Sequence, residues 1–124
     1  MKIRHFGIPV ENMDRALEFY RDLLGLKVQK DQIEEGEFIE TILGKKYLKF
    51  RTVKMGDKDV MIELVQGYHP HVAFTVKDVE EEYKRLKKKG IKFLSKPQVS
   101  ASGKARVVFC RDNDYNLVEL VEEL

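Results

Sequence analysis

Apolar residues along this chain alternate between the two-residue spacing of β-strands and the three- to four-residue spacing of helices. After the first strand, Met13, Leu17, Tyr20 and Leu24 recur at helical spacing, and Gly25 follows as a stop signal. The elements predicted for the first part of the chain are a strand at residues 2–10, a helix at 11–25, a strand at 26–33, a short helix at 36–46 and two strands within 47–66, joined by a turn at 55–58. The main order is therefore strand, helix and three strands.

The same order begins again in the second part of the chain. His5 and His71 lie 66 residues apart, and the segment "MIELV" around Glu63 recurs as "LVELV" around Glu119. Two copies with so long a period indicate a duplicated β-α-β-β-β module rather than a solenoid. The elements predicted for the second copy are a strand at residues 71–76, a helix at 77–90, a strand at 91–95, and strands at 104–110 and 116–123 around a polar turn.

Length and composition agree with one compact unit. A chain of 124 residues with 43% apolar residues can bury a core without help from disulfides or a structural metal. We therefore predict a single α+β domain over residues 1–124, with module one at 1–67 and module two at 68–124. Any bound metal would then serve function rather than folding.

Charge and cysteine content narrow the choice of partners and compartment. The net charge of +2 comes from 23 basic and 21 acidic residues that are mixed along the chain, so we expect neither nucleic acid nor a membrane surface as a partner. The basic cluster "KRLKKKG" fits the solvated end of a helix. A single cysteine excludes an internal disulfide framework, and no signal-peptide or membrane-spanning pattern is present. We expect a cytoplasmic protein.

Strand alternation predicts which side chains share a face. On the first strand, Phe6, Ile8 and Val10 should pack beneath the helix, which turns Ile3 and His5 to the opposite face. The same alternation in the other strands, and the repeat itself, predict that the second histidine and both glutamates join His5 there. Two histidines and two glutamates would thus share the face without helices.

Charge at these positions needs an explanation. A carboxylate on a largely apolar sheet face costs several kcal/mol unless it is solvated, paired or bound to a metal. A divalent cation satisfies both Glu63 and Glu119, because two carboxylates and the neutral imidazoles of His5 and His71 give a site of zero net charge. Nitrogen and oxygen ligands without thiolate suit Zn, Ni, Co, Mn or Fe(II). The alternative is that these are unrelated surface and core-edge residues, and their match between the two modules argues against it.

At these residues the sequence resembles the vicinal oxygen chelate superfamily, which includes glyoxalases, bleomycin-resistance proteins and extradiol dioxygenases. The similar blocks follow the family's order and are "HFGIPVENMDRALEFYRDLLGLKV", "VMIELVQ", "HVAFTVKDVEEEYKRLKKKGIKF" and "VVFCRDNDYNLVELVE". The resemblance implies a curled mixed sheet around a metal cavity, with His5, Glu63, His71 and Glu119 as metal ligands. The complete set of two histidines and two glutamates is most similar to glyoxalase I.

The resemblance implies a metal-dependent lyase or isomerase that transfers a proton on a small substrate with vicinal oxygens, such as a 2-oxoaldehyde thiol adduct. Glu119 or Glu63 could act as the base, with Glu119 favoured by family likeness. The alternatives are a non-enzymatic drug- or metabolite-binding protein, an epimerase, a ring-cleaving dioxygenase and a thiol transferase. A homodimer is expected, and the metal site could lie within one chain or be shared between two.

Two features depart from the family pattern. The usual Asp-Pro-Asp-Gly-Asn turn is here residues 112–116, with Tyr115 in the glycine position, which predicts either a strained positive φ or a different turn at the cavity rim. No residue set matches a glutathione-binding pocket.

Other polar residues have less specific interpretations. Arg51 and Arg106 could hold a substrate carboxylate, but surface salt bridges are the better explanation. His69 could face the cavity beside His71 or be solvated, and Cys110 should pack as a small buried group.

Overall fold

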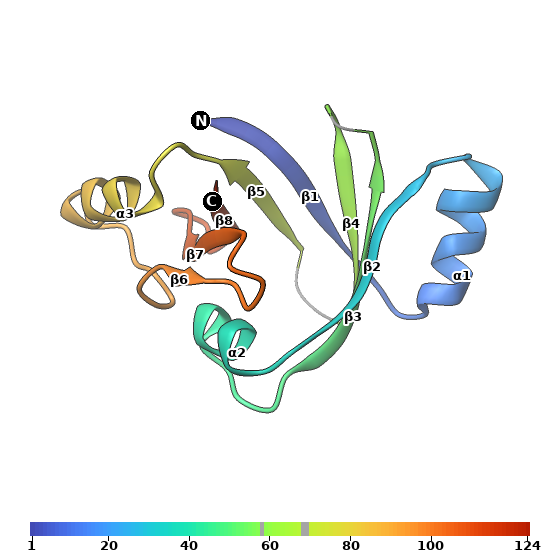
Figure 1. The fold of residues 1–124 in the computed structure, drawn as a ribbon, viewed down its shortest axis with the longest axis horizontal. Coiled ribbons are helices and arrows are strands. Elements are labelled where there is room, and N and C mark those ends of the chain that lie inside the picture. The colour runs from blue at the N-terminus through green and yellow to red at the C-terminus, as the bar shows by residue number, and fades with distance from the viewer. Residues whose placement is uncertain (58, 68–69) are drawn as a thin grey trace.

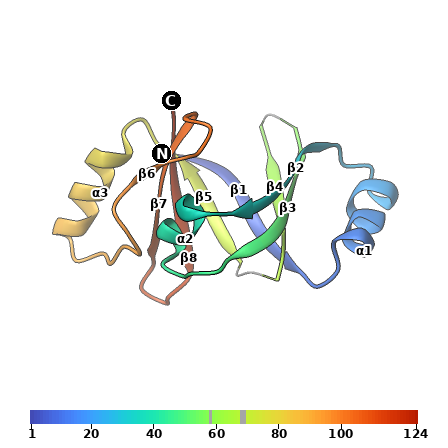
Figure 2. The same cartoon turned by 60° about the horizontal axis from the view of Figure 1, so that its bottom comes forward.

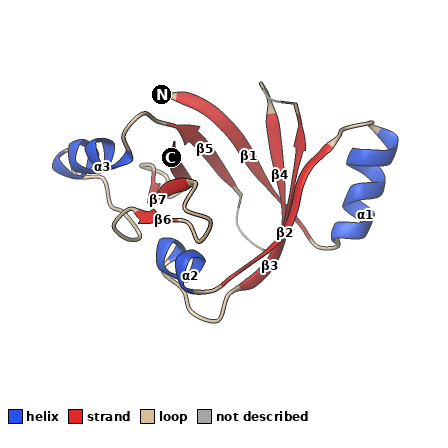
Figure 3. Cartoon of the chain, in the orientation of Figure 1, coloured by secondary structure: helices blue, strands red, loops and turns tan. Residues whose placement is uncertain are grey.

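The protein is described by a computed structural model that covers residues 1–57, 59–67 and 70–124. These residues form one curled sheet of eight strands in the order β2-β3-β4-β1-β5-β8-β7-β6, together with three α-helices (Figures 1 and 3). The strands are β1 (Lys2–Val10), β2 (Val28–Glu35), β3 (Lys49–Gly56), β4 (Met61–Gln66), β5 (His71–Thr75), β6 (Gln98–Val99), β7 (Ala105–Arg111) and β8 (Leu117–Glu123). The α-helices are α1 (Met13–Leu17), which continues into a π-helical segment (Glu18–Leu23), α2 (Glu37–Leu43) and α3 (Val79–Lys88).

The sheet is mixed, as predicted for an α+β fold. Its two central strands, β1 and β5, run antiparallel, while β1 pairs with β4 and β5 pairs with β8 in parallel. The strands β1 to β4 therefore form one half of the sheet and β5 to β8 the other. The predicted division into modules at residues 67 and 68 stays a prediction, because Tyr68 and His69 lie outside the described residues.

Helices α1 and α3 cover the same face of the sheet at its two ends, while α2 lies on the opposite face (Figures 1 and 2). Side-chain oxygens of Asn12 and Asp78 cap α1 and α3 by accepting backbone N–H groups. The cluster beneath α1 contains Met13, Leu17, Val53, Met55 and Leu64, the cluster beneath α3 contains Val76, Val79, Val108 and Leu120, and the cluster beneath α2 contains Ile39, Ile42, Leu43, Val107, Phe109, Leu117 and Val121.

The predicted packing of the first strand is confirmed in part. Ile8 and Val10 pack against the α1 cluster, but Phe6 is 49% exposed. Phe6 lies opposite Ile62 and Val72 in the strand register and is not among the described residues of the α1 and α3 clusters.

Ile3 was predicted on the same face as His5, and a β-bulge in β1 makes this prediction wrong. Ile3 lies opposite Phe74, whereas His5 lies opposite Ala73, so one extra residue, Arg4, is inserted between the two pairs. The insertion reverses the alternation, which turns Ile3 toward the helix-covered face with Phe74. Arg4 instead lines the same cavity as His5.

The strand predicted at residues 91–95 is wrong. That segment makes only an isolated bridge between Phe93 and Cys110, and regular pairing resumes in the two-residue strand β6. Pro97 lies between the two pieces, and it lacks the N–H group that a continuous ladder requires.

None of the described helices has the length and apolar character needed to cross a membrane.

Candidate metal centre

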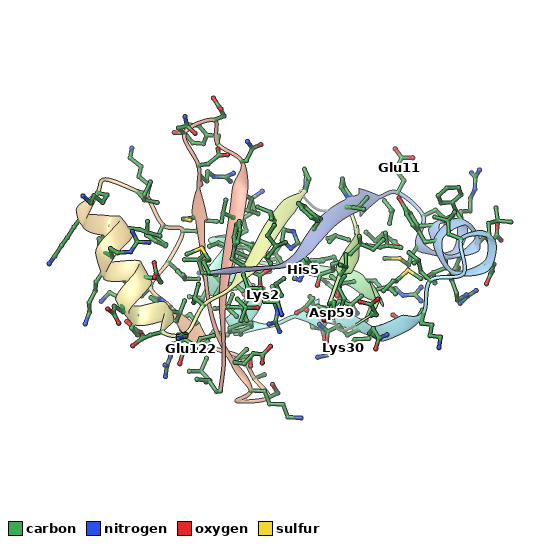
Figure 4. The ribbon with its side chains drawn as sticks, turned by 90° about the horizontal axis from the view of Figure 1, so that it is seen from above. Lys2, His5, Glu11, Lys30, Asp59 and Glu122 are labelled. Atoms are coloured by element: carbon green, nitrogen blue, oxygen red, sulfur yellow. The ribbon has the colours of Figure 1, made fainter. Side chains whose placement is uncertain are left out.

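His5 and His71 occupy the two central strands of the sheet. Both side chains face away from α1 and α3 and are buried, with 2% and 7% of their surface exposed. Their rings are nearly perpendicular, at 86°, and their Nε2 atoms lie 2.9 Å apart. The two imidazoles therefore meet near the middle of the molecule, where Figure 4 labels His5.

The two glutamates come from the strands that flank this central pair. Oε1 of Glu63, on β4, lies 3.8 Å from Nε2 of His5 and 3.5 Å from Nε2 of His71. Oε1 of Glu119, on β8, lies 3.5 Å and 3.4 Å from the same two nitrogens. One donor atom from each of His5, Glu63 and His71 lies within 4.8 Å of the others. Glu119 is not in that group of mutually close donors, but its contacts with both imidazoles bring all four residues singled out from the sequence together within one chain.

Gly7 provides the space that the His71 ring occupies. It lies opposite His71 in the β1–β5 register, and a Cβ atom at this position would be 2.1 Å from Nδ1 of His71. That separation is far shorter than van der Waals contact, so a larger residue would displace the ring. This role was not predicted, although alternation places Gly7 on the same face as His5.

The donor set fits a divalent cation. Neighbouring ligands of a six-coordinate ion, each at about 2.1 Å, are about 3.0 Å apart, close to the separation of the two imidazole nitrogens. Burial alone raises the pKa of Glu119, but hydrogen bonds and positive charge from His5 and His71 outweigh burial and hold that pKa well below its usual range. A divalent cation would favour the ionised carboxylates in the same way.

One detail departs from the usual surroundings of a metal-binding histidine. Such a histidine normally donates a hydrogen bond from its second ring nitrogen to a carbonyl or carboxylate. Nδ1 of His5 is buried and has no hydrogen-bond partner among the described residues. Packing between the strands, rather than an outer hydrogen bond, therefore holds this ring.

The four residues line a cavity of about 470 Å³ on the face of the sheet that carries α2. Figure 2 shows α2 in front of the sheet, between the ends marked by α1 and α3. The cavity is apolar where α2 meets the second half of the sheet and polar along β2 and β3. Its main apolar lining residues are Phe38, Ile39, Ile42, Leu43, Phe109 and Leu117, and its polar ones include Lys30, Gln32, Glu34 and Lys54.

Several ionisable residues of this cavity were missed in the sequence, among them Lys54 and Glu34. Lys54 lies directly opposite Glu63, and its Nζ is 3.8 Å from Oε2 of that residue. Glu34 accepts a hydrogen bond from the Gln32 amide. Burial, and then the negative charge of Glu63, raise the pKa of Glu34, while Lys54 opposes the shift. Counting alternation back through the β3–β4 hairpin would have found Lys54, but no local pattern marks Glu34.

The two arginines considered as substrate ligands instead form ion pairs. Arg51 donates to both carboxylate oxygens of Asp31, at 2.9 Å and 2.7 Å, and Arg106 lies 3.6 Å from Glu122. Neither arginine is among the described residues that line the cavity.

Three further residues can be placed or set aside. Cys110 is buried, as expected, and burial raises the pKa of its thiol to about 11. Tyr115 has a positive φ of 68°, the first of the two alternatives predicted for this turn, but it is 72% exposed and is not among the described lining residues of the cavity. His69 lies outside the described residues.

The chain has relatives along its whole length. A probable lactoylglutathione lyase of Synechocystis is 26% identical and aligns over 98% of this chain and 95% of its own. The uncharacterised protein YurT of Bacillus subtilis is 29% identical over 99% of this chain and 100% of its own. The crystal structure of methylmalonyl-CoA epimerase from Mycobacterium tuberculosis has the same fold, with a TM-score of 0.74 and 21% identity over 99% of this chain and 88% of that one.

The family assignment rests on a match to nearly the whole chain. Residues 2–120 match the model of the Glyoxalase/Bleomycin resistance protein/Dioxygenase superfamily. The duplicated strand-helix-strand order, the curled eight-stranded sheet and the lined cavity agree with that match. The chain therefore belongs to the glyoxalase/bleomycin resistance protein/dioxygenase superfamily.

Proposed function

We propose that this protein is a metal-dependent lyase or isomerase of the glyoxalase type, which transfers a proton on a small substrate with two adjacent oxygens. A 2-oxoaldehyde thiol adduct is such a substrate. The observation that carries the proposal is the convergence of two imidazoles and two carboxylates from one chain at the wall of a 470 Å³ cavity. A binding protein without chemistry would not need four converging nitrogen and oxygen donors there, with His5 and Glu63 buried.

The residues divide the work between holding an ion and moving a proton. His5, His71, Glu63 and Glu119 would hold Zn, Ni, Co, Mn or Fe(II). When bound, such an ion supplies Lewis-acid stabilisation of the negative charge that develops on a substrate carbonyl oxygen. The buried histidines fix the donor geometry, and the apolar residues beneath α2 exclude water from the reacting carbon.

A ligand carboxylate serves as the base, with Glu119 as the first candidate and Glu63 as the second. The base takes a proton from the carbon next to a carbonyl and returns it to the neighbouring carbon, so the reaction needs no oxidant or reductant. Lys54 lies 3.8 Å from one oxygen of Glu63, whereas Phe109 lies opposite Glu119 in the β7–β8 register. Among the described residues, Glu119 therefore has no cross-strand cation of the kind that Glu63 has.

Metal analysis of the purified protein tests this proposal. We expect about one divalent ion per chain in wild type, and loss of that ion in the double variant Glu63→Gln/Glu119→Gln. Glu81→Gln, an exposed change on α3, is the control and should retain the ion. A metal content equal in wild type and double variant would contradict the metal centre.

An assay on hemithioacetals of methylglyoxal tests the reaction itself. Glutathione and a second small thiol should be compared, because no residue set in the sequence matches a glutathione-binding pocket. Consumption of the substrate should stop on chelation and return when the metal is restored. A metal-loaded protein that is inert toward every hemithioacetal would keep the metal centre and reject the glyoxalase reaction.

The homodimer and the cytoplasmic location stay predictions. All four candidate ligands lie in one chain, so a partner chain is not needed to complete the donor set. Light scattering at two protein concentrations would determine the oligomeric state.

A further inference from the structure

The two glutamates of the metal centre have different neighbours across their strands. Lys54 on β3 lies opposite Glu63, and Phe109 on β7 lies opposite Glu119. The ammonium of Lys54 is 3.8 Å from Oε2 of Glu63, and 23% of this side chain is exposed. Among the described residues, a cation therefore lies across the strand from the glutamate of the first half of the sheet, and an aromatic residue lies across from the glutamate of the second half.

A second cation, Lys30, lies next to Lys54 on the neighbouring strand. Lys30 on β2 lies opposite Lys54 on β3, and both residues line the cavity. Figure 4 places Lys30 on the α1 side of His5. Arg4 also lines the cavity, but its guanidinium donates to Thr75 and Glu123. Lys54 and Lys30 are thus the cations on this wall whose positions suit a ligand in the cavity.

The charge of the wall follows from these neighbours. A divalent ion would balance Glu63 and Glu119, so Lys54 and Lys30 would add positive charge beside it. Glu34 and Glu35 also line the cavity along β2. Glu34 offsets one of these charges when it is ionised, whereas Glu35 pairs with Lys49, whose Nζ is 3.7 Å from Oε2 of Glu35. Burial and the nearby carboxylates disfavour the ionised form of Glu34. The wall is consequently positive overall and can attract an anion.

We propose that Lys54, assisted by Lys30, binds a negatively charged group of the substrate, a carboxylate or a phosphate, next to the metal centre. The substrate's apolar part then lies beneath α2, against Phe109 and Leu117. The inference rests on the proposed function and narrows it to vicinal-oxygen compounds that carry an anionic substituent. Lys54 is a specificity residue here, and the four ligands remain responsible for the chemistry.

Binding of three probes to the metal-loaded protein, measured by isothermal titration calorimetry, tests the proposal. Hydroxyacetone carries the two oxygens without charge, hydroxypyruvate adds a carboxylate, and dihydroxyacetone phosphate adds a phosphate. Wild type should bind at least one charged probe about tenfold or more tightly than hydroxyacetone. The preferred probe then identifies which anion the wall accepts.

Variants assign the preference to the wall. Lys54→Met should lower the ratio of charged-probe affinity to hydroxyacetone affinity about tenfold, whereas Lys54→Arg should keep that ratio. At a pH where Glu34 is ionised, Glu34→Gln should act in the opposite direction and strengthen binding of the charged probe. Lys49→Met is the matched control, because Lys49 lies on the same strand, is 72% exposed and is not among the described lining residues.

Two outcomes would overturn the proposal. A wild type that binds all three probes equally has no anion site, and a Lys54→Met variant that weakens all three equally shows that Lys54 only positions Glu63. A wild-type protein that binds no divalent metal, or that binds none of the three probes when loaded with metal, would instead contradict the proposed function. The two failures are therefore distinguishable.

Discussion

Across the strand pair from Glu63 lies Lys54, whereas across from Glu119 lies Phe109. The two halves of the sheet repeat one strand order, and each contributes a histidine from its first strand and a glutamate from its last. Strand register brings these residues together, because Gly7 of β1 lies between Glu63 of β4 and His71 of β5, and Ala73 of β5 lies between His5 of β1 and Glu119 of β8. Each histidine is therefore in line with the glutamate of the other half. Register does not determine which residues lie across the strand from the two glutamates. One half of the sheet therefore has a charged residue at that position and the other half an apolar one.

The helices of the two halves differ as well. α3 is a regular ten-residue helix, while α1 has five residues and continues as a π-helical segment. Both still bury apolar residues on the same face of the sheet. The strand order of the two halves can therefore be the same although the helices that cover them differ in regularity.

The largest expected effect contrasts the two cross-strand neighbours. Phe109 is 5% exposed within the α2 cluster, so Phe109→Ala should lower the free energy of unfolding by about 3–5 kcal/mol. Lys54→Ala should lower it by no more than about 1 kcal/mol, because its ion pair is partly solvated. Urea unfolding of chelator-treated protein measures both. Equal losses would contradict the division into a packed wall and a charged wall.

The second prediction concerns matched positions that follow the two histidines. Gly7 makes room for His71, while Ala73 occupies the corresponding position opposite His5. Gly7→Ala should displace His71 and weaken metal binding about 100-fold or more, at the upper end of effects from residues that position ligands. Competition with a chromophoric chelator measures this affinity.

Ala73→Gly is the control for that substitution. It removes a buried methyl group and should cost about 1–2 kcal/mol of stability, while metal affinity stays within about threefold of wild type. If Gly7→Ala also kept its metal, the close contact with His71 would not control the site.

That the four candidate metal ligands share one face could be predicted because strand alternation is local. His5, Glu63, His71 and Glu119 each occupy one parity of a short strand, and the internal repeat relates them. The same reasoning failed for Ile3, since the β-bulge at Arg4 reverses the parity and leaves no mark in the apolar pattern.

The cavity was harder to predict than the ligands. Its walls depend on how far the sheet curls and on where α2 packs, and both are tertiary properties. Glu34 enters the cavity only because β2 pairs with β3 and follows that curl. The strand predicted at residues 91–95 failed for a local reason, because Pro97 interrupts the ladder beyond it.

The third prediction compares the hairpin turns of the two halves. At the end of β3, Gly56 has a φ of 124°, and a Cβ atom there would lie 2.3 Å from the oxygen of Val60. Before β8, Tyr115 occupies the left-handed region without such freedom. Tyr115→Gly should therefore raise the free energy of unfolding by about 1 kcal/mol, as measured by thermal or urea unfolding, whereas Gly56→Ala should lower it. A Tyr115→Gly variant less stable than wild type would show that the tyrosine ring contributes more than its backbone costs.

The smallest effect is expected from Glu34, in the polar half of the cavity. Its raised pKa means that the folded protein keeps this proton at a pH where the unfolded chain has lost it. The free energy of unfolding therefore falls as pH rises from the ordinary carboxyl range through the raised pKa. Glu34→Gln cannot titrate, so chelator-treated variant and wild type should agree near pH 4 and separate in favour of the variant toward pH 7.

Two controls assign this pH dependence to the metal centre. Glu35 is the exposed residue next to Glu34, and the Glu35→Gln variant should show the same dependence of the free energy of unfolding on pH as wild type. Adding the divalent ion should reduce the difference between Glu34→Gln and wild type, because the charges of Glu63 and Glu119 that help to raise the pKa of Glu34 would then be balanced. A difference that is unaffected by metal would mean that burial alone sets the titration of Glu34, and the polar wall would then be electrostatically independent of the ligands beside it.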